Sequence, residues 1–201
     1  MEDQQHTTET LEHSALGVDS RKLGIWVFLA SEAVFFSGLI TTYMVEIARN
    51  RQGPEPAEVL SLPLVSVNTF ILIASSMAMV TALSHAQENH LRKAILWLIA
   101  TVVLGLAFLG GQVYEFIHLY LDGLTLSRNL FGASFFTLTG THGLHVLSGI
   151  IWIVLIIFQL LRFRGTQEQA AMKVEMAGLY WHFVDLIWII IFTFVYLLHP
   201  Q

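Results

Sequence analysis

Cysteine is absent from this 201-residue chain, and charged residues make up only 12% of it. The lack of cysteine excludes disulfides, iron–sulfur clusters and thiolate copper centres. A soluble domain usually carries about 25% charged residues, so half of the usual charged surface is missing. The net charge is −5 and no basic cluster is present, which argues against nucleic acid as a partner.

Hydrophobic residues, by contrast, make up 55% of the chain and gather in five long runs. Each run is long enough to cross about 30 Å of hydrocarbon as a helix that rises 1.5 Å per residue. We therefore predict an all-α, polytopic membrane protein in which residues 23–201 form a single bundle of five transmembrane helices. The expected helices cover approximately residues 23–47, 62–84, 94–120, 130–163 and 174–198.

The ends of the chain and the distribution of basic residues predict an orientation. Residues 1–20 contain five acids, no Lys or Arg and no apolar core, so they are unlike a cleavable signal peptide, and residues 1–22 are expected to form a solvated tail. Seven of the ten basic residues fall on one side of the predicted bundle and three on the other. The positive-inside rule therefore predicts a cytoplasmic N-terminus and an external C-terminus. Residues 48–61 and 122–129 would be external loops, whereas residues 84–92 and 165–172 would be internal.

Ionisable residues inside the predicted spans are few, and such groups usually face protein or water rather than lipid. Glu32 lies roughly 14 Å from the cytoplasmic end of the first helix, and His182 and Asp185 lie about 12 and 16 Å into the last one. The fourth helix runs in the opposite direction, so His145 should return to a similar depth. We expect Glu32, His145, His182 and Asp185 to form one interhelical polar layer.

Three further polar residues share helix faces with their neighbours. His142 is three residues before His145 on the fourth helix, and Gln112 and Glu115 have the same spacing on the third helix. The histidines could form hydrogen bonds between helices, each worth about 0.6–2 kcal/mol, or transfer protons, or ligate a b-type heme through His145 and His182. Hydrogen bonding is the favoured interpretation, because it serves the spacing of all these groups equally well.

Small and aromatic residues add predictions about packing. Glycines in membrane helices permit close approach of neighbouring backbones, which we expect at Gly105, Gly110, Gly111, Gly140, Gly143 and Gly149. Tryptophans near the ends of the runs are typical of an interfacial belt, and Trp26, Trp97 and Trp181 fit that pattern.

The arrangement of these residues resembles subunit III of the heme–copper terminal oxidases, in a short five-helix bacterial form. The mitochondrial type has two further helices at its N-terminus, which this chain lacks. The matching blocks extend along nearly the whole chain: Ser31-Glu32 with Phe35-Phe36; Asn68-Thr69 and Ser75-Ser76; Gly105 with Gln112-x-x-Glu115-Phe116; Phe135-Phe136-x-x-x-Gly140-Thr141-His142-Gly143-Leu144-His145-Val146; and Tyr180-Trp181-His182-Phe183-Val184-Asp185-x-x-Trp188.

The resemblance implies an accessory subunit with no catalytic residue and no metal ligand of its own. Heme and copper are expected in subunits I and II of a complex that reduces O2 to water and pumps protons across the bacterial cytoplasmic membrane. Subunit I is the expected main partner, with subunit II, a small subunit IV and structural phospholipids as further partners. The resemblance implies that the subunit stabilises subunit I and supports proton uptake and O2 access. Glu32 matches the family's carbodiimide-reactive membrane carboxylate.

Other functions remain open from the sequence alone. Related proteins accompany nitric oxide reductases, and an autonomous b-type membrane cytochrome is a further alternative. A small transporter is disfavoured, because the chain shows no internal repeat and no pair of broken helices. The electron donor, cytochrome c or quinol, is not encoded here, since the resemblance places the donor site on other subunits.

Overall fold

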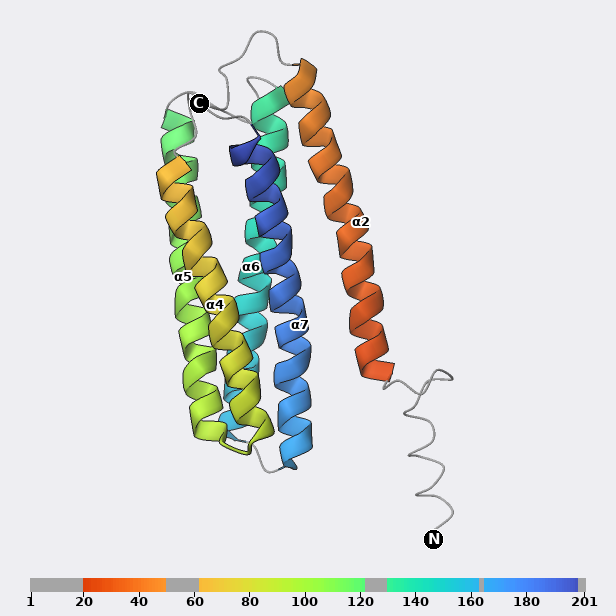
Figure 1. Ribbon diagram of the computed structural model, residues 1–201, viewed down its shortest axis with the longest axis vertical. Coiled ribbons are helices and arrows are strands. Elements are labelled where there is room, and N and C mark those ends of the chain that lie inside the picture. The colour runs from red at the N-terminus through yellow and green to blue at the C-terminus, as the bar shows by residue number, and fades with distance from the viewer. Residues whose placement is uncertain (1–19, 50–61, 122–129, 163–164, 199–201) are drawn as a thin grey trace.

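A computed structural model describes residues 20–49, 62–121, 130–162 and 165–198 (Figure 1). The regular structure of these residues is entirely helical: α2 (Ser20–Arg49), α4 (Leu62–Gln87), α5 (Leu91–Leu121), α6 (Leu130–Leu161), α7 (Gln167–Phe192) and the short π-helical segment η1 (Thr193–Leu197). Within the described residues, five helices are long and apolar enough to cross a membrane. The all-α, five-span prediction is thus confirmed. Residues 1–19 of the predicted tail, nearly all of loop 48–61 and the loop 122–129 lie outside the described residues.

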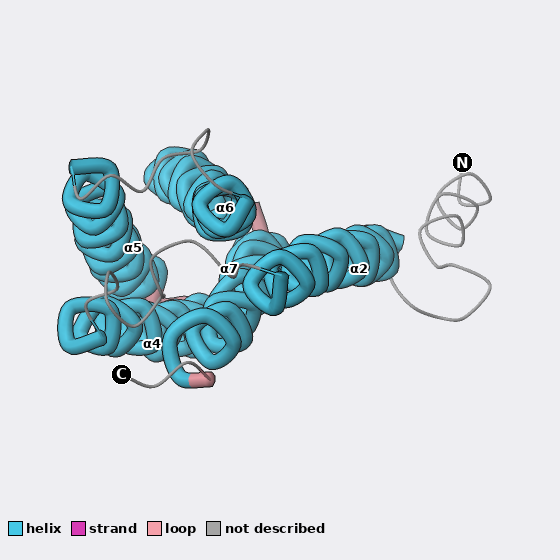
Figure 2. Tube along the Cα trace, turned by 90° about the horizontal axis from the view of Figure 1, so that it is seen from above, coloured by secondary structure: helices cyan, strands magenta, loops and turns pink. Residues whose placement is uncertain are grey.

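The helices run along one common direction, with α2 at the edge of the bundle. Figure 1 shows α4 and α5 side by side as an antiparallel hairpin, and these two helices share the most extensive contact in the structure. The main contacts of α2 are with α6 and α7, and in the end-on view of Figure 2 α2 extends outward beside α7. Only 17% of the most hydrophobic window of α2 is buried, against 50% in the last span. Most of the surface of α2 therefore faces away from this chain.

The helix ends differ from the predicted ones, because polar residues continue the helices beyond the apolar runs. The predicted internal loop 165–172 is mostly helix: α7 begins at Gln167, after Thr166 in an extended conformation, and the Ala170 amide donates to the Thr166 carbonyl at 3.2 Å. The predicted turn 84–92 shrinks to residues 88–90, since α4 continues to Gln87 and α5 begins at Leu91. Hydropathy identifies only the apolar part of a helix. The backbone hydrogen bonds of the helix continue into the polar residues on either side.

Large side chains from other helices, and not neighbouring backbones, fill the space next to several core glycines. A Cβ atom on Gly105 of α5 would lie 2.8 Å from the Trp181 ring, and one on Gly149 of α6 would lie 3.0 Å from the same ring. The Asn68 side chain fills the space at Gly111 in the same way, and nothing lies within 4 Å of the corresponding position at Gly110. The expectation of close backbone approach is therefore wrong at Gly105, Gly111 and Gly149, where the missing side chain makes room for a bulky partner.

The same contacts correct the position of one tryptophan. Trp181 has 0% of its surface exposed and donates its indole N–H to Ser75 Oγ at 3.0 Å. It therefore belongs to the packed core and not to an interfacial belt. Trp26 and Trp97 are 57% and 39% exposed, as the belt prediction requires.

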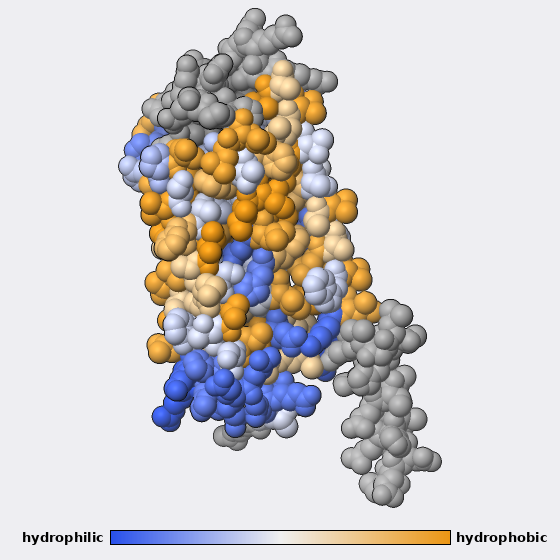
Figure 3. Space-filling model, viewed as in Figure 1, coloured by the Kyte–Doolittle hydropathy of each residue, from blue (hydrophilic) through white to orange (hydrophobic). Residues whose placement is uncertain are grey.

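Hydropathy on the molecular surface agrees with the five spans. Figure 3 shows a broad hydrophobic surface along the helices, with hydrophilic side chains gathered at the end where the α4–α5 turn and the start of α7 lie. A surface of this kind suits the hydrocarbon of a bilayer, and the hydrophilic end suits the adjoining water.

Candidate functional site

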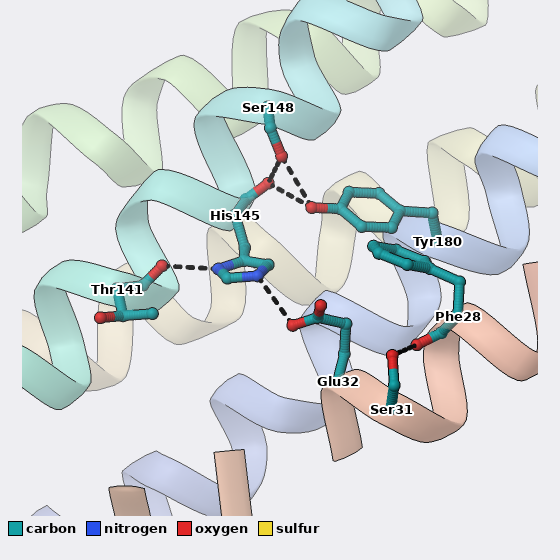
Figure 4. A network of polar contacts seen from close by, with 7 residues as sticks. All are labelled: Phe28, Ser31, Glu32, Thr141, His145, Ser148 and Tyr180. Carbon is teal, nitrogen blue, oxygen red and sulfur yellow. Dashed lines mark hydrogen bonds and ion pairs between the residues drawn. The ribbon is translucent and has the colours of Figure 1, made fainter. Parts of the chain in front are cut away.

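The central contact of the site joins α2 to α6 (Figure 4). His145 Nε2 lies 3.1 Å from Glu32 Oε2, although 113 residues separate the two in sequence. Glu32 occupies the same buried stripe of α2 as Leu29 and Phe36, so the amphipathic pattern of the helix directs its carboxyl towards the bundle. The sequence prediction that His145 returns to the depth of Glu32 is confirmed.

The hydrogen bonds of His145 fix where its protons are. His145 Nδ1 lies 2.8 Å from the Thr141 carbonyl oxygen, which can only accept, so Nδ1 carries a hydrogen. A neutral ring then has a bare Nε2 that must receive a proton from Glu32, whereas a charged ring donates from Nε2 to the carboxylate. In either case one proton lies between Glu32 and His145.

Two hydroxyl groups stabilise the backbone next to this pair. The Tyr180 hydroxyl from α7 lies 3.0 Å from the His145 carbonyl oxygen, and the Ser148 hydroxyl lies 2.8 Å from the same atom and 2.7 Å from Tyr180 Oη. The ring of Phe36 meets the His145 ring edge-on, with centroids 4.9 Å apart. As a result α2, α6 and α7 meet at one position, and Figure 4 shows Phe28 and Tyr180 beside it.

The other two members of the predicted layer form a separate group between α7 and α4. His182 Nδ1 lies 2.5 Å from Ser76 Oγ. The two carboxyl oxygens of Asp185, three residues further along α7, are buried and form no hydrogen bond with the described residues. The single polar layer of four residues is therefore wrong. Because α4 lies next to α7 and away from α2, the polar groups of α7 meet α4 instead of Glu32.

His142 departs from the expected hydrogen bonding. It has 0% of its surface exposed, and neither ring nitrogen has a hydrogen-bond partner in the described part of the chain. Its ring stacks on Trp188 with centroids 4.9 Å apart and meets the edges of Phe108 and Phe36. The rotation of about 60° between positions three apart on a helix turns His142 away from Glu32 and into an aromatic cluster.

Gln112 and Glu115 each form a contact that the sequence did not identify. Gln112 Nε2 donates to the Thr139 carbonyl of α6 at 2.6 Å, and the Tyr196 hydroxyl of η1 lies 3.2 Å from both carboxyl oxygens of Glu115. A hydropathy profile cannot identify a backbone carbonyl or a phenol as the partner of a given polar side chain. The only available signal was the aromatic residue at the end of the last run.

These features define a class of protein: a multi-pass helical membrane protein in which several buried polar side chains, such as Glu32 and His145, form hydrogen bonds across helix interfaces. The sequence matches the family model "Cytochrome c oxidase subunit III" over residues 4–199. It is 42% identical over 176 residues to quinol oxidase subunit 3 of Bacillus subtilis (strain 168), a match that covers 88% of this chain and 86% of the relative. Cytochrome c oxidase subunit 3 of Bacillus sp. (strain PS3) is 39% identical over 176 residues, with 88% and 84% covered.

A third relative covers still more of the chain. The probable quinol oxidase subunit 3 of Staphylococcus saprophyticus is 37% identical over 194 residues, 96% of each protein. The chain belongs to the cytochrome c oxidase subunit III family, the accessory subunit of the heme–copper oxidases. The resemblance inferred from the sequence blocks is confirmed.

Proposed function

We propose that this chain is the non-redox subunit III of a proton-pumping oxidase that reduces O2 to water in the bacterial cytoplasmic membrane. The Glu32–His145 contact carries the proposal. Both ring nitrogens of His145 have partners, at 2.8 and 3.1 Å, so ligation of a heme by this residue would break the link between α2 and α6. The polar groups of this contact therefore serve the arrangement of the helices, and electron transfer is left to the other subunits.

The exposed surface of α2 supports contact with subunit I. Trp26, Val27 and Val34 are 57%, 64% and 73% exposed on this helix, and Figure 2 shows α2 at the edge of the bundle. An apolar helix face of this kind is covered in the membrane by lipid or by another subunit. Subunit I is the proposed main partner, with subunits II and IV as further members of the complex.

A groove between α2 and α6 supports phospholipid binding. It has a volume of about 240 Å³ and is lined by Leu39, Thr42, Glu46, Ala133, Ser134 and Thr137. Its mostly apolar walls suit part of an acyl chain. Lipid held there would contact both α2 and α6 and would strengthen the attachment of α2 to the bundle.

The named relatives include both quinol and cytochrome c oxidase subunits, so the donor follows from the rest of the complex. Co-purification in mild detergent identifies it: a subunit II with a dicopper centre indicates cytochrome c, and a subunit II without those ligands indicates quinol. Recovery of a nitric oxide reductase instead would refute the oxidase assignment.

Two substitutions at Glu32 separate the structural role from proton transfer. In Glu32→Gln the side-chain amide can still donate to His145 Nε2, so we expect normal heme content, near-normal O2 consumption and only modest changes in proton uptake or in inactivation during turnover. Glu32→Leu removes the contact and should lower the stability of the subunit by about 0.6–2 kcal/mol. Glu168→Gln, at the exposed start of α7, is the matched control. Complete loss of turnover in a fully assembled Glu32→Gln complex would refute the non-catalytic role.

A further inference from the structure

A cluster of metal-ligating side chains lies in the turn between α4 and α5, far from the Glu32–His145 contact. His85 is in the last turn of α4, and Glu88 and His90 are in the short link before α5. The link belongs to the hydrophilic end of the molecule in Figure 3, where the α4–α5 turn of Figure 1 lies. The exposed side chains of Glu88 and His90 therefore lie where aqueous ions can reach them, and His85 lies next to them at the edge of the bundle.

The spacing of the three ligand atoms suits a single ion. Glu88 Oε2 lies 3.6 Å from His85 Nδ1 and 3.4 Å from His90 Nδ1, and ligand atoms from all three residues lie within 4.8 Å of one another. An ion bound at about 2.0–2.1 Å by each ligand in tetrahedral geometry separates two ligand atoms by about 3.3–3.4 Å. Small rotations of the exposed His90 and Glu88 side chains would complete this geometry.

The backbone of the turn holds the cluster in place. The His90 amide donates to the His85 carbonyl at 2.8 Å and the Asn89 amide approaches the Ala86 carbonyl at 3.3 Å, the paired bonds of a Schellman helix ending. Asn89 has a φ of 62°, the left-handed conformation that this ending requires and that asparagine tolerates better than most residues. The Ser84 hydroxyl donates to the other carboxyl oxygen, Glu88 Oε1, at 3.3 Å. The backbone that carries the three ligands is thus ordered before any ion arrives, and the exposed His90 and Glu88 side chains supply the remaining adjustment.

One ligand atom lacks the hydrogen bond that a purely structural role would supply. His85 Nδ1 is buried and has no hydrogen-bond partner among the described residues, since Glu88 Oε2 at 3.6 Å is too distant. A buried polar atom left unpaired costs about 1–3 kcal/mol. Coordination of a metal by this nitrogen would remove that cost.

We propose that His85, Glu88 and His90 bind one divalent transition-metal ion of the Zn²⁺ type. Two imidazoles and one carboxylate favour Zn²⁺ or Cu²⁺ over Mg²⁺ and Ca²⁺, which prefer oxygen ligands. The remaining coordination position is filled by water. Binding would lock the α4–α5 hairpin at its turn. The proposal is independent of the oxidase assignment, because it uses only residues of this turn.

The test measures Zn²⁺ binding to the full-length chain, purified in detergent with an affinity tag that contains no histidine. Competition with a chromogenic chelator should give one site per chain, and binding should weaken at least tenfold in His85→Gln and in His90→Gln. His118→Gln is the matched control, because His118 is an exposed histidine near the other end of α5. Circular dichroism without zinc checks that each variant is folded.

Electron paramagnetic resonance of Cu²⁺ added to the wild-type chain provides a second, variant-independent measurement. Coupling to two imidazole nitrogens is expected, and coupling to one should remain in His90→Gln. Affinity that is equal in wild type, His85→Gln and His90→Gln would overturn the proposal, as would less than one tight site per chain. Equal loss of affinity in His118→Gln would place the bound metal elsewhere and would also overturn it.

Discussion

Replacement of Gly105 by alanine tests whether the Trp181 ring fills the space that this glycine leaves. An added Cβ atom would lie 2.8 Å from Trp181 Cη2 and 3.2 Å from Ile150 Cδ1. The ring cannot withdraw, because its indole N–H is bonded to Ser75 and because Gly149 encloses its other edge. Overpacking of this kind costs about 1–3 kcal/mol. Alanine regains about 0.5–1 kcal/mol of helix propensity over glycine, so the net loss should be about 0–2.5 kcal/mol.

Gly110→Ala on the same helix is the matched control, since nothing lies within 4 Å of the position that its Cβ would occupy. The propensity gain is common to both variants and cancels in their difference, which leaves about 1–3 kcal/mol for the contact with Trp181. Thermal unfolding of the purified chain in detergent, followed by circular dichroism, measures the difference. A change of roughly 2–4 °C per kcal/mol is the usual scale for a chain of this length.

A double substitution sharpens the test. Trp181→Phe removes the outer ring that meets Gly105, so Gly105→Ala should cost less in that background than in the wild type. Additive effects of the two substitutions would show that the packing inferred here is incorrect. Equal melting temperatures for Gly105→Ala and Gly110→Ala would lead to the same conclusion.

Three further substitutions probe the buried polar groups and one surface contact, with unfolding in detergent as the measurement. His142→Phe keeps an aromatic ring and removes two buried nitrogens without partners among the described residues. The free energy of unfolding should therefore stay the same or rise by about 1–2 kcal/mol. A lower stability would reveal a hydrogen bond to His142. Tyr196→Phe removes the donor to Glu115 and should cost about 1–3 kcal/mol, and no loss would refute that contact. Lys22→Ala breaks the 2.7 Å ion pair with Glu175; because both groups are about one-third exposed, the cost should be about 0.2–1 kcal/mol and should vanish at high salt.

The number of spans and the Glu32–His145 contact could be predicted from the sequence, because both follow from length and depth along apolar helices. A charged residue within a span is conspicuous, and 1.5 Å per residue places it along the membrane normal. Depth alone does not say which helices are neighbours. For this reason depth groups His182 in one layer with Glu32, His145 and Asp185, although its partner is Ser76 on α4.

The remaining misses have a common physical origin. Tyr196 donates its hydroxyl to Glu115, and Thr139 accepts at its backbone carbonyl from Gln112. Almost any span contains such groups, so only the packing of the helices decides which of them pair. Likewise Trp181 lies near the start of an apolar run, yet the glycines of α5 and α6 make a core position for it. Sequence position indicates depth, and the rotation of each helix about its axis decides the contacts.

The contact between Glu32 and His145 also orders events during synthesis of the chain. The first of the described helices, α2, makes its main contacts with α6 and α7, the last two described helices in chain order. Meanwhile α4 and α5, joined by a turn of three residues, can pair as soon as both are inserted. A nascent chain that stops after α5 would thus hold a closed hairpin and a solitary α2 with an unpaired glutamate in lipid. The contact between Glu32 and His145 is therefore among the last to form, once α6 has been inserted.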